Sequence, residues 1–166
     1  MIAYRTKKTI SEHMQEDPAF YKKFSEMLEE AIRAFREGRI GELQYLNTVE
    51  PIHDAVRDRK GDDLPAALRQ YEVAKAFYGV IREVFGGRIA DEKKNATDAA
   101  IKIDQIISGM KIVNWTNNTD VQNKMETAME EFLFDFKKER GLELSFDDID
   151  AILQRCLDIA RVRYAA

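Results

Sequence analysis

The chain has 166 residues, of which 45% are hydrophobic and 34% are charged, and this suits a single domain with a hydrophobic core. The formal net charge of -4 argues against wholesale non-specific DNA binding. No apolar run approaches the about 20 residues that span a bilayer, and the opening "MIAYRTKKTI" has no apolar stretch of signal-peptide length. Cys156 is the single cysteine, so no internal disulfide can form and we expect a cytoplasmic protein without a membrane partner.

The first predicted helices are marked by their capping residues. Thr9 and Glu12 have the spacing of a capping box, which predicts a short helix over residues 11–16. Asp17 suits the N-cap of a longer helix, with Pro18 at its first position and Gly38 as its stop. Apolar residues recur along this longer helix at helical spacing, and they are Phe20, Phe24, Met27, Leu28, Ala31 and Phe35.

Two further helices are predicted over residues 40–61 and 62–87. Pro51 lies inside the first and should kink it or split it after Glu50, because proline has no backbone N–H and crowds the preceding turn. Gly86 and Gly87 should end the second. The apolar residues are Leu43, Leu46, Val49, Ile52 and Val56 in the first helix, and Leu68, Tyr71, Ala74, Tyr78, Ile81 and Phe85 in the second.

The remainder of the chain predicts helices over about residues 90–108, over 119–141 and over 145–164. No stretch shows the two-residue alternation of a strand. We therefore expect an all-α fold, an irregular helical bundle of about five to seven helices with short loops. The loosest segments, 57–63 and 85–95, are too short to divide the chain, so a single domain over residues 1–166 is predicted.

Trp115 is the single tryptophan and precedes a polar segment, "TNNTD". Thr119 and Gln122 have capping-box spacing, and Asp120 would complement the positive end of a helix dipole, so this segment predicts a helix start. We expect Trp115 to lie over the first turn as a packing anchor. The alternative is a stacking platform for a base or a hot spot for a protein partner.

Residues with catalytic chemistry do not form a recognisable constellation in the sequence. There is no glycine-rich phosphate loop, and His13 and His53 are too far apart for a helical pair of metal ligands. Cys156 lies between Leu153 and Leu157 and is expected to be a buried thiol. We therefore predict no catalytic, cofactor-binding or metal-binding residue in this chain. Arginine clusters at 33–39, 57–60 and 155–163 are expected to be solvated helix ends, with contact to nucleic acid or an acidic partner as the alternative.

Three segments resemble the C-terminal helical region of the restriction (R) subunit of type I restriction-modification enzymes. They are "EDPAFYKKFSEMLEEAI", "IVNWTNNTDVQNKM" and "FKKERGLELSFDDIDAILQRCLDIARVRY". The family's Asp-Trp-Thr tripeptide is here Asn114-Trp115-Thr116. The resemblance implies a fragment of a much longer subunit, whose nuclease and ATP-driven motor domains use ATP and Mg and lie outside these residues. It also implies a non-catalytic domain that docks this motor and nuclease to the methyltransferase subunits.

A docking surface needs apolar or aromatic anchors ringed by charge. Tyr21 lies off the predicted apolar face of its helix, and Arg161, Arg163 and Tyr164 combine cations with an aromatic ring. Together with Trp115 these are the candidate interface residues. Two other functions remain open, namely a DNA-contacting helical module that guides duplex past the motor and an unrelated helical interaction domain.

Overall fold

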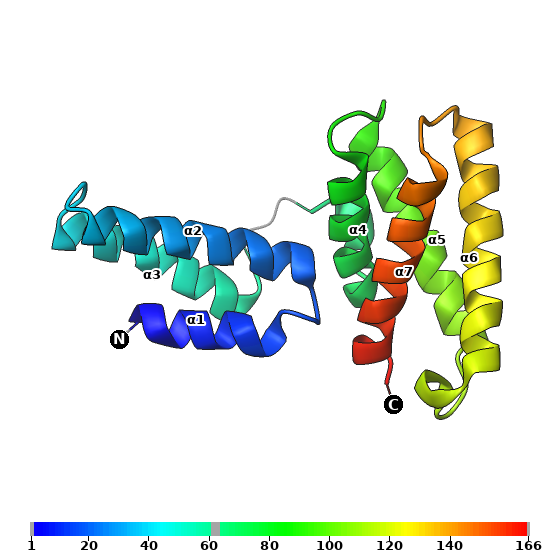
Figure 1. The fold of residues 1–166 in the computed structure, drawn as a ribbon, viewed down its shortest axis with the longest axis horizontal. Coiled ribbons are helices and arrows are strands. Elements are labelled where there is room, and N and C mark those ends of the chain that lie inside the picture. The colour runs from blue at the N-terminus through cyan, green and yellow to red at the C-terminus, as the bar shows by residue number, and fades with distance from the viewer. Residues whose placement is uncertain (1, 61–63, 166) are drawn as a thin grey trace. The chain divides into compact units, whose positions relative to one another are not determined.

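The computed structural model describes residues 2–60 and 64–165, and every regular element within them is helical, which confirms the predicted all-α class. No helix in these ranges is long and apolar enough to cross a membrane. Two 3₁₀ turns, η1 (Ala66–Leu68) and η2 (Trp115–Asn117), accompany the α-helices. The α-helices in Figure 1 are α1 (Ile2–His13), α2 (Pro18–Arg36), α3 (Glu42–Asp58), α4 (Glu72–Phe85), α5 (Glu92–Met110), α6 (Thr119–Arg140) and α7 (Phe146–Arg163).

The chain divides into two compact units, Met1–Asp63 and Leu64–Ala166, where the sequence analysis expected one domain. The buried apolar side chains explain the division, because they form two clusters that have no residue in common. The boundary falls at the end of segment 57–63, "RDRKGDD", which contains no apolar side chain that could join either cluster. Six charged residues and one glycine in succession are therefore enough to separate two cores, although the sequence analysis judged this segment too short.

The first unit is a three-helix arrangement in which each of α1, α2 and α3 contacts the other two. The predicted start of α2 is confirmed, since the Phe20 backbone N–H donates to Asp17 Oδ1 at 3.3 Å and Pro18 is the first helical residue. Its predicted stop is confirmed as well. Gly38 has φ +73°, and the backbone N–H of Arg39 donates to the Ala34 carbonyl at 2.9 Å, which closes the last turn.

Helix α1 differs from its prediction, because it begins at Ile2 and includes the residues expected to cap a shorter helix. The Thr9 hydroxyl donates to the Arg5 carbonyl at 3.0 Å and so bonds within the helix instead of capping one. Thr6 is fully buried, and its hydroxyl donates to the Ile2 carbonyl at 2.8 Å. The same hydroxyl lies 2.9 Å from His53 Nδ1 on α3. Packing against the other two helices therefore fixes α1 where local sequence signals are weak.

Helix α3 continues through Pro51 from Glu42 to Asp58, so the predicted split after Glu50 does not occur. Val49, Ile52 and Val56 are buried on both sides of the proline, and this packing holds the helical turn that the proline weakens. Leu43 and Leu46, which were predicted on the apolar face, are exposed.

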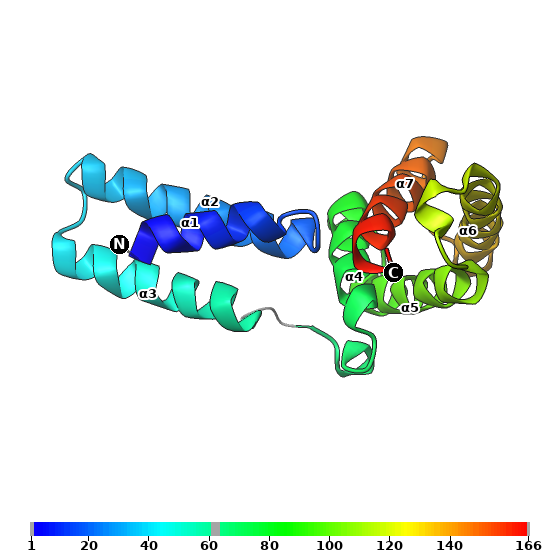
Figure 2. The same ribbon diagram turned by 90° about the horizontal axis from the view of Figure 1, so that it is seen from below.

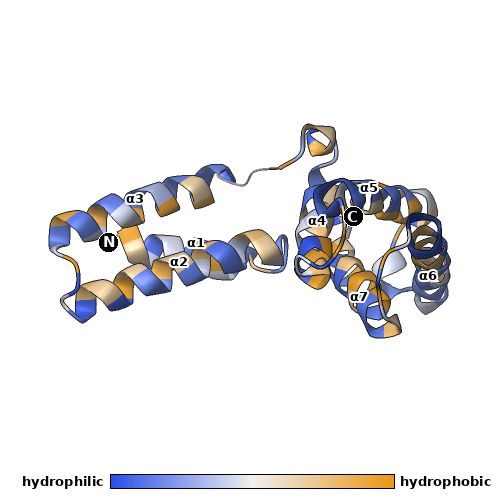
Figure 3. Cartoon of the chain, turned by 90° about the horizontal axis from the view of Figure 1, so that it is seen from above, coloured by the Kyte–Doolittle hydropathy of each residue, from blue (hydrophilic) through white to orange (hydrophobic). Residues whose placement is uncertain are grey.

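The second unit is a four-helix ring. Helix α4 contacts α5 and α7, and α6 contacts the same two helices from the other side, as Figure 2 shows. Apolar and hydrophilic stretches alternate along each of these helices (Figure 3), and the apolar ones supply a single buried cluster. Cys156 lies in this cluster, as predicted, and burial raises the pKa of its thiol.

One helix start in the second unit, that of α4, differs from expectation, whereas α7 starts where it was predicted. Residues before Tyr71 form the turn η1 instead of the first part of α4, because Pro65 leaves the chain extended immediately before that turn. Helix α7 begins with a full capping box, in which the Asp148 backbone N–H donates to Ser145 Oγ and the Ser145 backbone N–H donates to Asp148 Oδ2, each at 3.0 Å.

Candidate interaction surface at one end of the second unit

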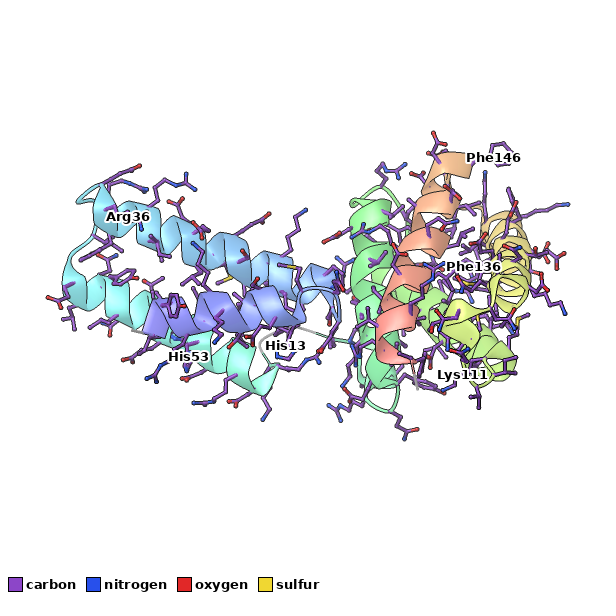
Figure 4. The ribbon with its side chains drawn as sticks, turned by 60° about the horizontal axis from the view of Figure 1, so that its bottom comes forward. His13, Arg36, His53, Lys111, Phe136 and Phe146 are labelled. Atoms are coloured by element: carbon purple, nitrogen blue, oxygen red, sulfur yellow. The ribbon has the colours of Figure 1, made fainter. Side chains whose placement is uncertain are left out.

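Three of the five predicted interface residues, Trp115, Arg161 and Tyr164, meet at one end of the second unit. At this end α5 finishes, the turn η2 leads into α6, and α7 finishes. Figure 4 labels Lys111 at this end and Phe146 at the opposite end of the same unit. The helix ends thus bring together residues that are far apart in the sequence.

Trp115 is fully buried, with 0% of its side chain exposed. Its indole Nε1–H donates to the backbone carbonyl of Tyr164 at 2.8 Å, across 49 residues of chain. This burial agrees with the packing-anchor interpretation, because the ring fills the core and its single donor is satisfied. The side chain is therefore not available as a stacking platform or as an exposed hot spot.

The cap of α6 is Asn118 instead of the predicted Thr119. The Val121 backbone N–H donates to Asn118 Oδ1 at 3.2 Å, and Thr119 is already the first helical residue. Asp120 lies in the first turn, where its charge complements the helix dipole as expected.

Gln122 connects the loop before α6 to the end of α7. Its Nε2 donates to the carbonyls of Trp115 and Thr116 at 3.2 Å and 2.8 Å. Its Oε1 accepts from Nε and a terminal nitrogen of Arg161 at 3.0 Å and 2.8 Å, while Arg161 also pairs with Asp158 at 2.7 Å. Arg161 is thus held in place by two partners, Gln122 and Asp158. The role of Gln122 as a bridge could not be predicted from sequence, because its partner Arg161 lies 39 residues away in the chain.

Tyr164 closes this end of the ring. Its hydroxyl donates to Asp104 Oδ1, and Ser108 Oγ lies 3.5 Å from the same hydroxyl. Burial, followed by the hydrogen bond to Asp104, raises the pKa of the Tyr164 phenol. The Nζ atom of Lys111 lies 4.2 Å from the centre of the Tyr164 ring, which places a cation over its face.

Tyr21 does not belong to this surface and is not exposed. It lies in the first unit with 2% of its side chain exposed, packed edge-on against Phe20 at a centroid distance of 4.9 Å. The sequence prediction that Tyr21 faces a partner is therefore wrong. Arg163 is half-buried in the last turn of α7, next to Tyr164 in the chain.

The exposed part of this end includes two apolar residues that the sequence analysis missed. Ile112 and Val113 have 54% and 91% of their side chains exposed in the loop between α5 and η2. The sequence feature that could have identified them is a pair of consecutive β-branched residues between a helix end and the tryptophan. We call Lys111, Ile112, Val113, Arg161, Arg163 and Tyr164 the carboxyl-end surface.

The arginine clusters are largely neutralised by carboxylates. Arg39 pairs with Glu37 at 2.8 Å, and Arg155 pairs with Glu83 at 2.6 Å. Other pairs include Arg33 with Glu30, Arg57 with Asp58, Arg59 with Glu16 and Arg161 with Asp158. These clusters therefore do not form the unpaired basic stripe that follows a phosphate backbone.

The chain matches no protein-family model, no curated protein and no solved structure in the three comparisons made. Within the described ranges, no three His, Cys, Asp or Glu side chains are grouped so that they could hold a metal ion. The inference about function consequently depends on the carboxyl-end surface and on the resemblance of the three sequence segments.

Proposed function

We propose that this chain is a non-catalytic helical assembly domain of the R subunit of a type I restriction enzyme. In this role it docks the ATP-dependent, DNA-translocating nuclease subunit to the methyltransferase core. One observation supports this above the others. Residues 112–125 and 136–164, two of the three segments that carry the resemblance, are joined by the Trp115–Tyr164 and Gln122–Arg161 hydrogen bonds.

The carboxyl-end surface has the composition of a docking site. Ile112 and Val113 offer apolar area to a partner, and Lys111 and Arg163 supply charge beside them. The surface is also fixed in advance, because Trp115 and Gln122 hold the loop to α7. A preorganised loop loses less conformational entropy when a partner binds.

A DNA-contacting module receives less support from the same residues. Most of the arginines that favoured it in the sequence are paired with carboxylates, at distances from 2.6 Å for Arg155 with Glu83 to 3.6 Å for Arg59 with Glu16. A helix end that is already neutralised releases few counterions from a duplex, and counterion release drives most non-specific DNA binding.

The proposal is tested with the modification subunits of the enzyme to which the proposed R subunit would belong. The R subunit that contains the chain should recover them in a pull-down assay. The double variant Ile112→Ser with Val113→Ser should reduce recovery about tenfold, which corresponds to about 1.4 kcal/mol of lost binding free energy. Phe146→Ser is the matched control, because Phe146 is also exposed but lies at the opposite end of the unit.

Both outcomes are decisive. If the unaltered R subunit recovers no modification subunit, the assembly role is wrong. If recovery is undiminished in the double variant, the carboxyl-end surface is not the docking site. A loss of helical content in the double variant, measured by circular dichroism, would indicate misfolding. In that case the milder variant Val113→Ala would replace the double variant in the pull-down.

A further inference from the structure

One face of the α2–α3 hairpin in the first unit is hollowed into a groove of about 520 Å³. Its floor is apolar and is formed by Ala31 and Ala34 of α2 together with Ile52 of α3. Met27 lies at one wall with 45% of its side chain exposed. From Glu26 to Ala34 the groove follows about two and a half turns of α2.

Helix α1 packs on a different face of this hairpin and lies below α2 and α3 in Figure 1. Figure 3 is seen from above, and therefore shows the hairpin from the side away from α1. The contacts of α1 establish this. Lys7 pairs with Glu29 and Thr6 contacts His53, whereas Glu30 and Ile52 line the groove. Successive residues of a helix point about 100° apart, so the groove and α1 lie on separate faces.

The packing of α1 shows which kind of helix the α2–α3 hairpin can bind. Ile10 is buried against α2 and α3, and Lys7 Nζ meets the Glu29 carboxylate at 2.9 Å beside that apolar contact. Lys7 is also the main cause of the lowered pKa of Glu29. An apolar stripe with a flanking lysine is therefore the pattern that already packs against one side of α2.

The groove has the same arrangement of an apolar surface flanked by glutamates of α2. In the described residues of the first unit, however, no basic helix lies opposite it. Glu26 and Glu30 stand along its α2 edge, and the α3 edge is formed by the uncharged Gln44 and Thr48. Glu30 is held by Arg33 at 3.3 Å and Arg39 at 3.2 Å. Within residues 2–60 and 64–165, the Glu26 carboxylate forms no ion pair.

The acidic edge also selects against a second copy of the chain as occupant. A two-fold contact that laid α2 antiparallel on α2 at this groove would bring the Glu26 carboxylates of the two copies close together. Like charges at such short range are repulsive. A basic partner has the opposite sign and fits the edge.

We propose that the α2–α3 groove binds an amphipathic helix of a partner subunit, with small apolar anchors on one face and a lysine or arginine beside them that pairs with Glu26. This inference rests on the proposed assembly function, for which it names a second contact and the chemistry of the partner. Recognition is of the helix-in-groove kind, in which anchors at positions i, i+3, i+4 and i+7 fill the apolar floor.

Two synthetic peptides test the groove on the full chain. Both carry leucine and alanine at i, i+3, i+4 and i+7, and they differ only in having lysine or glutamate at the flanking positions. Nuclear magnetic resonance shifts should locate the lysine peptide at the groove residues of α2 and α3. Fluorescence anisotropy should show at least about fivefold tighter binding of the lysine peptide than of the glutamate peptide.

A charge-reversal variant and its control complete the test. Glu26→Lys should remove the preference for the lysine peptide, because it replaces attraction with repulsion at the groove edge. Glu50→Lys makes the same change at an exposed glutamate of α3 outside the groove, and it should leave the preference intact. Circular dichroism should show equal helical content in both variants.

Three results would overturn the inference. They are equal affinity for the two peptides, resonance shifts outside the groove, or a self-associated chain whose dimer is strengthened by Glu26→Lys in sedimentation experiments. None of these results depends on the methyltransferase pull-down, so the assembly proposal would stand even if the groove bound no peptide. Conversely, if the peptide binds but the pull-down recovers no modification subunit, the groove is confirmed as a binding site and the assembly role is rejected.

Discussion

Trp115 provides the sharpest test of how the second unit is held together. The indole is fully buried and its N–H is bonded to the Tyr164 carbonyl at 2.8 Å. Trp115→Ala removes the ring, and the cavity and lost burial should lower the free energy of unfolding by about 3 to 5 kcal/mol. Trp115→Phe keeps most of the apolar contact but leaves the Tyr164 carbonyl without its donor, which should cost about 1 to 3 kcal/mol.

The assay is urea denaturation of the full chain, followed by far-ultraviolet circular dichroism because the variants lack the single tryptophan. Amide hydrogen exchange then assigns the loss to a region. Faster exchange should be confined to α4 to α7, since Trp115 belongs to the second buried cluster. Val113→Ala, in the same loop but 91% exposed, is the control and should stay within about 0.5 kcal/mol of the unaltered chain. A loss below about 1 kcal/mol for Trp115→Ala would refute the reasoning.

The remaining predictions concern the two capped helix starts of the second unit. Asn118→Ala should lower the free energy of unfolding by about 1 kcal/mol, because it removes the side chain that caps α6. Thr119→Ala should change this free energy by less than about 0.5 kcal/mol. If urea denaturation shows the larger loss for Thr119→Ala, Thr119 is the cap instead. The pKa of Asp148 is lowered, first by the Ser145 backbone N–H and also by Arg88. Such a carboxylate stabilises the fold above its ordinary pKa and loses this contribution as the pH falls through the lowered value. The free energy of unfolding should therefore fall more steeply with acidification in the unaltered chain than in Asp148→Asn, and equal slopes would contradict the linkage.

Local signals were sufficient for some elements and insufficient for others. Asp17, Pro18 and Gly38 specify the two ends of α2 through backbone chemistry that depends on neighbouring residues alone. Helix α1 has no acidic residue in its first turn, and its buried Thr6 and Ile10 gain their environment from other helices. Its extent could not be read from the sequence for this reason.

Tyr21 shows why helical periodicity underestimates burial. The expected apolar stripe of α2 assumed one packed face, but α2 contacts both α1 and α3. A helix packed on two sides buries a wider arc, and Tyr21 falls inside it. Conversely, Phe35 and Leu43 fitted the predicted stripes of α2 and α3 but are exposed.

The candidate surface was anticipated in part. The size of Trp115 and the polar residues after it indicated an anchored helix start, but its bonding partner lies 49 residues away in the chain. The link from Gln122 to Arg161 is equally non-local. The division into two units was missed because apolar residues of both cores have the same spacing, and spacing alone does not show which helices share a core.

The closed ring of the second unit has a consequence during synthesis on the ribosome. Helices α1 to α3 are consecutive and contact one another, so the first core is complete once α3 has emerged. Helix α4 instead packs against α7 as well as α5, and Trp115 obtains its hydrogen-bond acceptor from Tyr164. Until α7 leaves the exit tunnel, the apolar face of α4 and the indole of Trp115 lack their final partners. This interval exposes hydrophobic surface of the kind that chaperones bind, and slower translation of α5 and α6 would lengthen it.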